Sequence, residues 1–230
     1  MEPVQPAPSY GVIDHYLGDQ GADYFAWQGE DGLAQASYNL HLWRPHIAAE
    51  DDVLEFGCGG GFLLKALTAR RKVGVEPNPH ARACASRLGI ETYATTDGIA
   101  GTFDKVITSH ALEHVPPPRQ AILELKGKLR DTSSKLLILL PLDDWRTKAN
   151  RRYNPADTHM HLHAWTPQGL GNLISTCGLR VEEVRVIRHA WPPGRRLLWA
   201  IHPTVFHAAA RFWSFWNRQR QLFAVASLQG

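Results

Sequence analysis

Cysteine is scarce in this 230-residue sequence, and its three residues stand far apart at Cys58, Cys84 and Cys177. An odd number at wide spacing matches neither a disulfide framework nor a CxxC zinc site, which favours a reducing compartment. No run of 18 apolar residues is present, so the sequence predicts no transmembrane helix. Residues 1–9 are rich in proline and lack a basic and an apolar region, so we expect no signal peptide. These absences predict a globular, cytoplasmic protein of one domain, with at most a modest appendage.

Acidic residues are also missing from one end of the chain. Residues 184–230 contain no Asp or Glu but seven arginines. Subtracting these 7 from the 25 basic residues leaves 18, against 22 acidic residues, so residues 1–183 carry a formal charge of about −4. A mildly acidic body therefore precedes a strongly basic tail, and we expect the two to have different roles.

Short apolar runs alternate with helical patterns between residues 50 and 190. Buried parallel strands have continuous apolar runs, as residues 135–140 do. Alternation of this kind with short connections predicts βαβ units in a doubly wound α/β sheet. The expected strands are 53–56, 72–75, 90–93, 105–108, 135–140 and 181–187, and the expected helices are 61–70, 79–88, 118–130 and 167–177.

The clearest motif is a glycine loop, VLEFGCGGGF at residues 53–62, which joins an expected strand to an expected helix. Glycine lets a ligand approach the backbone closely, and amides at a helix N-terminus are free to donate. The dinucleotide fingerprint fails, because neither Gly57 nor Gly59 has a glycine or alanine five residues later, and no Gly-Lys-Ser/Thr follows for a phosphate-binding loop. Glu55 beside the loop would repel a pyrophosphate and favours a cationic ligand.

Two further carboxylates follow the next expected strands. Glu76 ends the strand at 72–75, where a carboxylate can accept hydrogen bonds from both hydroxyls of a ribose. Asp97 follows the third strand, where it can accept from the amino group of an adenine. With Glu55, three acids at successive strand ends suit a ligand that has an amine, a ribose and an adenine.

Residues 53–61, Glu76, Asp97 and 103–118 together resemble the motifs of class I S-adenosylmethionine (SAM)-dependent methyltransferases. The resemblance extends over residues 40–190. It implies a Rossmann-like sheet of seven mostly parallel strands, with SAM along the C-terminal strand edges. We therefore expect a flank or helical lid at residues 1–44, a SAM-binding domain at 45–190 and a basic, aromatic helical tail at 191–230.

The resemblance also implies which residues hold the cofactor. Glu55, Gly57 and Gly59 would contact the methionine part and Glu76 the ribose. Asn78 and Asp97 would approach the adenine. The other residues implied for the cofactor lie in the same motifs: Cys58, Gly61, Phe62, Pro77, Thr96, Gly98, Ser109, His110 and His114.

The histidines near residue 110 have two interpretations. Residues 110–114 read HALEH, which matches the H-x-x-E-H signature of a zinc protease. That chemistry needs both histidines on one helix, whereas here the motif follows an expected strand and is cut off by Pro116-Pro117-Pro118. It also resembles the segment after the fourth strand of the methyltransferases, where it lines the SAM pocket. We expect this second role and no metal.

A second group of histidines alternates in HMHLHAWTP at residues 159–167. The segment resembles the entry to the last helix of methyltransferases that modify bacterial surface polysaccharides and lipids, where it overlies the acceptor pocket. His161 or His163, with His114, would then be candidates for a general base, because imidazole titrates near neutral pH. Two alternatives stay open: rings that cap the helix opened by Thr166-Pro167, or a metal site.

We expect an enzyme that transfers a methyl group from SAM to a small-molecule acceptor, leaving S-adenosylhomocysteine. The expected acceptor is a hydroxyl of a sugar or a lipid-linked glycan. A quinone- or lipid-type methyltransferase and a SAM-binding protein without turnover are the alternatives. The tail, with its arginines, Trp and Phe, could pack on the body, form a homodimer or lie on a membrane surface. Nucleic acid is a weaker alternative, because the acidic body offers no basic groove.

Overall fold

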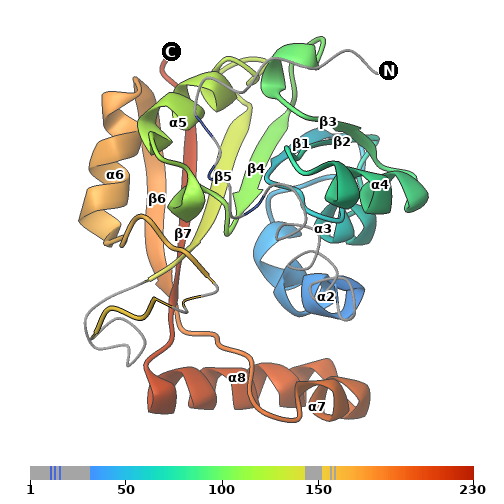
Figure 1. Ribbon diagram of the computed structural model, residues 1–230, viewed down its shortest axis with the longest axis vertical. Coiled ribbons are helices and arrows are strands. Elements are labelled where there is room, and N and C mark those ends of the chain that lie inside the picture. The colour runs from blue at the N-terminus through green and yellow to red at the C-terminus, as the bar shows by residue number, and fades with distance from the viewer. Residues whose placement is uncertain are drawn as a thin grey trace.

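The computed structural model describes Gly11, Ile13, Tyr16 and residues 32–142, 152–155, 157 and 159–230. Its centre is a seven-stranded sheet in the order β3-β2-β1-β4-β5-β7-β6 (Figure 1). The strands from β3 to β5 run parallel to their neighbours, and β7 is antiparallel to both β5 and β6. The expected Rossmann-like sheet of seven mostly parallel strands is therefore confirmed.

The elements follow the alternation expected between residues 50 and 190. The strands are β1 (Asp52–Phe56), β2 (Arg71–Val75), β3 (Glu91–Tyr93), β4 (Lys105–Ser109), β5 (Lys135–Pro141), β6 (Leu179–Ile187) and β7 (Gln221–Leu228). The α-helices are α2 (Gly32–Trp43), α3 (Phe62–Ala66), α4 (Pro79–Arg87), α5 (Pro118–Lys126), α6 (Pro167–Thr176), α7 (Arg195–Ile201) and α8 (Pro203–Asn217). The described residues also form the short 3₁₀ helices η2 (Thr96–Gly98) and η3 (Leu112–His114).

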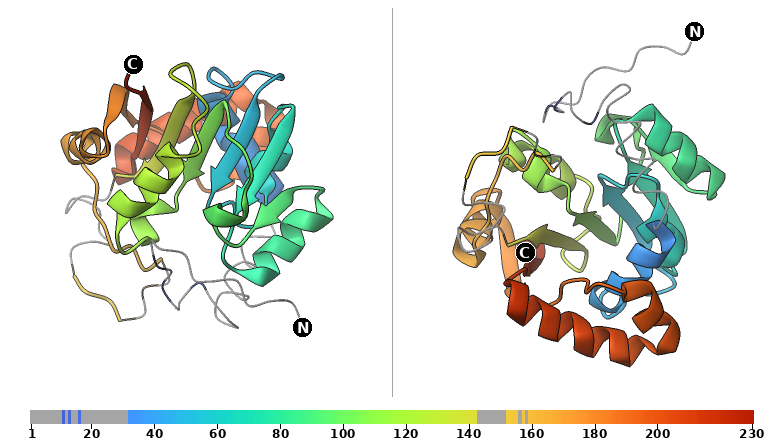
Figure 2. Two further views of the ribbon diagram at one scale, coloured as in Figure 1. Left: turned by 90° about the horizontal axis from the view of Figure 1, so that it is seen from above. Right: turned by 60° about the horizontal axis from the view of Figure 1, so that its bottom comes forward.

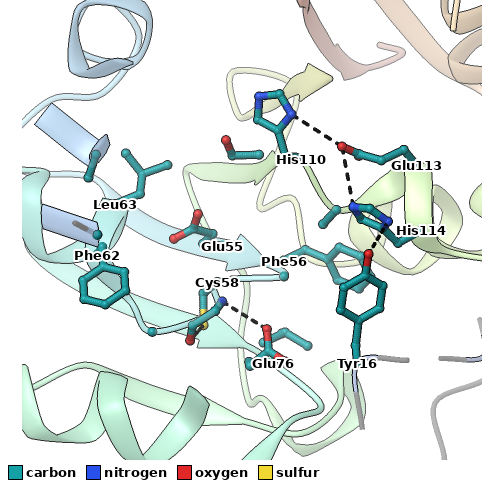
Figure 3. A pocket seen from close by; sticks show the side chains of 18 of the residues that line it. Tyr16, Glu55, Phe56, Cys58, Phe62, Leu63, Glu76, His110, Glu113 and His114 are labelled. Carbon is teal, nitrogen blue, oxygen red and sulfur yellow. Dashed lines mark hydrogen bonds and ion pairs between the residues drawn. The ribbon is translucent and has the colours of Figure 1, made fainter. Parts of the chain in front are cut away.

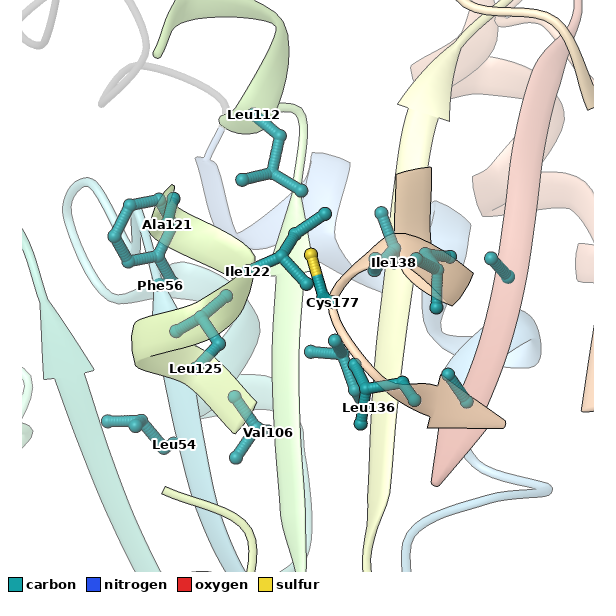
Figure 4. Packing of buried hydrophobic residues seen from close by; sticks show 14 of the residues in the cluster. Leu54, Phe56, Val106, Leu112, Ala121, Ile122, Leu125, Leu136, Ile138 and Cys177 are labelled. Carbon is teal, nitrogen blue, oxygen red and sulfur yellow. The ribbon is translucent and has the colours of Figure 1, made fainter. Parts of the chain in front are cut away.

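Both faces of the sheet are buried, which explains the continuous apolar runs of its strands. On one face Leu136 and Ile138 of β5 belong to a core cluster with residues of α5 and α6 (Figure 4). On the other face Leu137 and Leu139 belong to a cluster with residues of α2 and α3. Because successive side chains of a strand point to opposite faces, a strand covered on both sides needs apolar residues at every position.

Two expected helices are shorter than the sequence pattern suggested. Helix α3 ends at Ala66 because Leu67 already has an extended backbone, and the Arg70 amide donates to the Asp51 carbonyl as the chain enters β2. Helix α5 ends before Gly127. The expected start of α6 is confirmed, since the Thr166 hydroxyl accepts from the Gly169 amide across 3.0 Å.

The segment after residue 190 differs from the expected helical tail. Helices α7 and α8 form there, but residues 221–228 become β7, which inserts between β5 and β6. Figure 2 shows α7 and α8 lying across one side of the molecule, next to α2. Tyr38 of α2 stacks on Phe206 of α8 with ring centroids 4.5 Å apart.

Most of the expected N-terminal lid, residues 1–44, lies outside the described residues. Among the described helices, none is long and apolar enough to span a bilayer.

Candidate active site

The glycine loop between β1 and α3 forms one wall of a cavity of about 460 Å³ at the C-terminal edge of the sheet. The Gly57 and Cys58 amides both donate to the Val75 carbonyl, which holds the loop against β2. A Cβ atom on Gly57 would lie 2.4 Å from the Ala111 Cβ, and one on Gly60 would lie 2.5 Å from the Phe62 ring. Side chains at these positions would collide with the cavity wall, so the loop requires glycine.

Glu76 lies at the end of β2 and faces this cavity (Figure 3). Its Oε2 accepts from the Gly59 amide at 3.0 Å, and its Oε1 accepts from the Asn78 amide at 2.9 Å. Burial raises the pKa of Glu76 to about 7, although both hydrogen bonds favour the charged form. The carboxylate is thus held in one orientation beside the loop before any ligand arrives.

Glu55, at the end of β1, lines the same cavity and is 3% exposed. Burial, and then the neighbouring charge of Glu76, raise the pKa of Glu55 well above its ordinary value. Its Oε2 has no hydrogen-bond partner among the described residues. A buried carboxylate oxygen without a partner is costly, so this atom is suited to a cationic or hydrogen-donating ligand.

Sequence reasoning missed two residues of α2 on this cavity, Asn39 and Trp43. Both are buried cavity residues, and neither Asn39 Oδ1 nor Trp43 Nε1 has a hydrogen-bond partner within the described part of the chain. Their spacing of four residues places them on one face of the helix. This spacing could have indicated that the two side chains share a face of the helix. No local motif, however, connects α2 with the glycine loop.

The segment after β4 brings the rings of His110 and His114 close to the carboxylate of Glu113. This carboxylate is fully buried, 3.4 Å from Nδ1 of His110 and 3.8 Å from Nε2 of His114 (Figure 3). Burial disfavours its charge, but the two rings outweigh that effect and leave the pKa of Glu113 below its ordinary value. The backbone here is a 3₁₀ turn, so the two histidines are not placed on one α-helix as the zinc-protease signature requires.

Tyr16 of the N-terminal segment contacts this cluster and was also missed by sequence reasoning. Its hydroxyl lies 2.8 Å from Nδ1 of His114 and donates to the His159 carbonyl. His161 is close by, with its ring centroid 5.0 Å from that of His114. Burial lowers the pKa of His114, which favours the neutral imidazole.

The other predicted base, His163, lies elsewhere. Its Nε2 is 2.9 Å from the Val115 carbonyl oxygen, and its ring packs against Trp165. It lines neither this cavity nor the neighbouring one, whereas His114 and His161 line the first. Its position favours the structural interpretation of the alternating histidines for this ring.

Some of the predicted cofactor residues line the first cavity and others do not. Asp97 and Gly98 lie in the 3₁₀ turn η2, where Asp97 is exposed, and Thr96 hydroxyl donates to Glu124 at 2.7 Å. The Asn78 side chain accepts from the first amides of α4 and donates to the Tyr16 carbonyl. The predicted cofactor residues Gly61, Asn78, Thr96, Asp97 and Gly98 lie outside the cavity lining. The predicted residues that line it are Glu55, Gly57, Cys58, Gly59, Phe62, Glu76, Pro77, Ser109, His110 and His114.

Among the described residues, two groups of side chains have the spacing of metal ligands. Glu113, His114 and His161 offer ligand atoms within 4.8 Å of one another in the cavity. His41, His189 and His207 do so between α2, the segment after β6 and α8. In the second group Nε2 of His189 and Nδ1 of His207 are already hydrogen-bonded to each other at 3.0 Å.

A second cavity, of about 880 Å³, adjoins the first. It is lined by polar and aromatic side chains, among them Arg152, Tyr153 and Asp157. The residues common to the two linings are Gln35, Asn39, His110, His159, His161 and Trp191. The arrangement offers room for two ligands that meet at this shared wall, where His161 lies.

Comparison with known proteins finds a matching family and a curated relative. The model of the methyltransferase domain family matches residues 29–184. An uncharacterised methyltransferase of Schizosaccharomyces pombe is 26% identical in an alignment of 125 residues, and the match covers 47% of this chain and 48% of that protein. This chain therefore matches about half the length of that curated relative.

Solved structures share the fold at low sequence identity. A SAM-dependent methyltransferase of Thermotoga maritima has a TM-score of 0.60 at 16% identity, over 90% of this chain and 95% of its own. A chain from a complex that contains the Haloferax volcanii Trm112 methyltransferase activator has a TM-score of 0.67 at 15% identity, over 93% of this chain and 99% of its own. These similarities establish the fold.

Proposed function

The chain belongs to the methyltransferase domain family, and we propose that it transfers a methyl group from SAM to a hydroxyl of a sugar or a lipid-linked glycan. SAM is the cofactor, and S-adenosylhomocysteine is the product that remains. The observation that carries the proposal is the pair of adjoining cavities. One has acidic side chains and buried polar atoms without a partner among the described residues, and the other is lined mainly by polar and aromatic side chains.

The first cavity fits the amino-acid end of SAM. Glu55 Oε2 and Asn39 Oδ1 are acceptors without a described partner, and they would take hydrogen bonds from the ligand's ammonium group. Trp43 Nε1 is a donor without a described partner and would bind the ligand's carboxylate. Because an unsatisfied buried polar group costs on the order of 1–3 kcal/mol, a ligand that satisfies all three gains affinity and specificity.

The same cavity fits the nucleoside and the sulfonium. Glu76 is oriented to accept from ribose hydroxyls, and the apolar surfaces of Phe62, Leu63 and Pro77 offer contact for the adenine ring. Glu55, Glu76 and Glu113 together make the cavity acidic. A cationic ligand would offset the cost of their buried charges.

When bound, SAM supplies an electrophilic methyl group on its sulfonium, so the chain has mainly to position the acceptor and exclude water. His161 would take the proton of the attacking hydroxyl, because it lines both cavities at their shared wall. His114, which Tyr16 holds in place, lies next to His161 and is favoured in its neutral form. The buried carboxylate of Glu113 beside these rings would stabilise the proton once it has moved.

The second cavity supports a polar acceptor. The guanidinium groups of Arg152 and Arg220 and the carboxylate of Asp157 offer hydrogen-bond partners for several hydroxyls or for an anionic substituent. Tyr153 and Trp191 add aromatic surfaces on which a sugar ring can stack. A mixture of this kind suits a glycan better than an apolar quinone ring.

The proposal is tested by incubating the purified protein with SAM and a panel of acceptors, and measuring the release of S-adenosylhomocysteine. The panel contains nucleotide sugars, polyprenyl-diphosphate sugars, quinols and phospholipids. We expect product with a sugar-containing acceptor, and a rate at least about 100-fold lower from a His161→Ala variant. Turnover with quinols or phospholipids alone would favour the lipid-type alternative. Binding of SAM without product from any acceptor class would contradict the proposed enzyme activity.

A further inference from the structure

Helices α7 and α8 expose an apolar face for which the described residues provide no cover. Phe212, Phe215 and Trp216 of α8 are 68%, 75% and 73% exposed. Such exposure is unusual for large aromatic side chains, which are normally buried where a partner is available. The face is extended by the exposed side chains of Leu197, Ile201 and Val205.

The opposite side of α8 accounts for its attachment to the protein. Phe206, Ala210 and Ser214 recur every four residues and are fully buried, with Phe206 stacked on Tyr38 of α2. Val205, Phe212 and Trp216 recur at spacings of seven and four residues, which places them on a different stripe of the same helix. The helix is therefore apolar on two sides, and only one of them is needed to hold it on the body.

The charges that this segment itself carries are all of one sign. Arg211 and Arg218 are exposed on or beside α8, and no acidic residue occurs in residues 184–230. A symmetric dimer through this face would bring the same arginines of two copies together without acids to pair them, which costs free energy. An anionic surface satisfies the arginines and the apolar face at once.

We propose that the α7–α8 face, defined by Leu197, Ile201, Val205, Phe212, Phe215 and Trp216, binds to the surface of a membrane that contains anionic lipids. The apolar side chains enter the headgroup region, and the arginines contact lipid phosphates. Tryptophan suits this position, because its ring is apolar and its N–H can reach water. Helix α8 lies along the outer edge of the molecule (Figure 1). It would therefore lie in the plane of the membrane surface.

This placement also has a consequence for the acceptor, which rests on the proposed function. Trp191 and Arg195, at the start of this segment, line the second cavity. Docking through α7 and α8 would bring that cavity close to the lipid surface, where a lipid-linked acceptor is confined. Membrane binding itself does not depend on methyl transfer and is measured separately from it.

The experiment is co-sedimentation of the full chain with vesicles of phosphatidylcholine, with or without about 30% phosphatidylglycerol. We expect binding to the anionic vesicles only, and a strong loss of it in about 0.5 M salt. The Phe212→Ser/Phe215→Ser/Trp216→Ser variant should bind at least about tenfold more weakly. A Leu33→Ser variant, at an exposed apolar position of α2, is the matched control and should bind as the wild type does.

A second variant, Arg211→Gln/Arg218→Gln, keeps the proposal testable if the triple variant does not fold. It should weaken binding to anionic vesicles. Light scattering in solution gives the oligomeric state of the same samples. Absence of binding to anionic vesicles, or binding that neither variant weakens, would overturn the proposal. A dimer that dissociates in the triple variant, without vesicle binding by the wild type, would show instead that a second copy covers the face.

Discussion

The backbone amide of Gly59 donates a hydrogen bond to Oε2 of Glu76 across 3.0 Å. This contact joins the glycine loop after β1 to the carboxylate at the end of β2, two motifs that are separated along the chain. It leaves the loop and the carboxylate in one fixed arrangement on the cavity wall. Burial of the Glu76 carboxylate raises its pKa to about 7, and this shift has a measurable consequence.

Binding of SAM should depend on pH through Glu76. At pH 6 most of this carboxyl group is protonated, and at pH 8 most of it is ionised, because burial raises its pKa to about 7. The ionised form binds a cation and ribose hydroxyls better, so the affinity should rise by about tenfold from pH 6 to pH 8. Calorimetry in buffers of different ionisation enthalpy should also detect proton release near pH 7. The Glu76→Gln variant should lose this part of the pH dependence, and an unchanged profile in that variant would contradict the assignment.

Two glycine substitutions should separate steric conflict from backbone strain. Gly61 and Gly89 have almost the same φ, +76° and +78°. A Cβ on Gly61 would lie 2.8 Å from the Ala85 Cβ, whereas one on Gly89 would meet nothing within 4 Å. Gly89→Ala should cost about 1–2 kcal/mol of unfolding free energy for the left-handed backbone alone. Gly61→Ala should cost about 1–3 kcal/mol more, measured by urea denaturation. Equal losses would show that the neighbouring helix α4 moves away freely.

The two histidines of the alternating segment should respond differently to substitution. His161→Ala should lower kcat by at least about 100-fold, since it removes the proposed base, with little change in the affinity for S-adenosylhomocysteine. His163→Ala should leave kcat within a few-fold of the wild-type value and lower the free energy of unfolding by about 1 kcal/mol, because the bond to the Val115 carbonyl is lost. The opposite pattern would make His163 the base.

Trp43→Phe should weaken binding of only those ligands that carry an amino-acid end. The substitution removes the Nε1 donor and keeps an aromatic ring in the core. We expect the Kd of S-adenosylhomocysteine to rise by about tenfold, which corresponds to one lost hydrogen bond to a charged group. The Kd of methylthioadenosine, which lacks the carboxylate and the amine, should stay the same. A parallel loss for both ligands would mean that Trp43 acts through packing.

The sequence predicted the parts of the fold and the candidate site that depend on local pattern. The run at residues 136–140 of β5 is apolar at every position because both faces of the sheet are covered, and the turn after β1 needs glycine because Ala111 and Phe62 crowd it. Glu55 is the penultimate residue of β1, and Glu76 follows β2 directly. Their place at one edge of the sheet is a consequence of parallel strand order.

The remaining parts depend on contacts between distant segments. Strand β7 lies at the end of the arginine-rich tail, and only its pairing with β5 and β6 identifies it. Tyr16 reaches His114 across 98 positions of the chain, which no local motif reveals. Asp97 is a site residue that local reasoning predicts and that stays a prediction. It follows β3 as expected, but the 3₁₀ turn η2 leaves it exposed and outside the cavity lining.

The central claim is that the glycine-loop cavity binds SAM, and calorimetric titration with S-adenosylhomocysteine tests it most directly. NAD serves as the control ligand and Glu76→Ala as the control variant. We predict one binding site per chain for S-adenosylhomocysteine, no binding of NAD, and a strong loss of affinity in Glu76→Ala. Absence of binding, or tighter binding of NAD than of S-adenosylhomocysteine, would contradict the account.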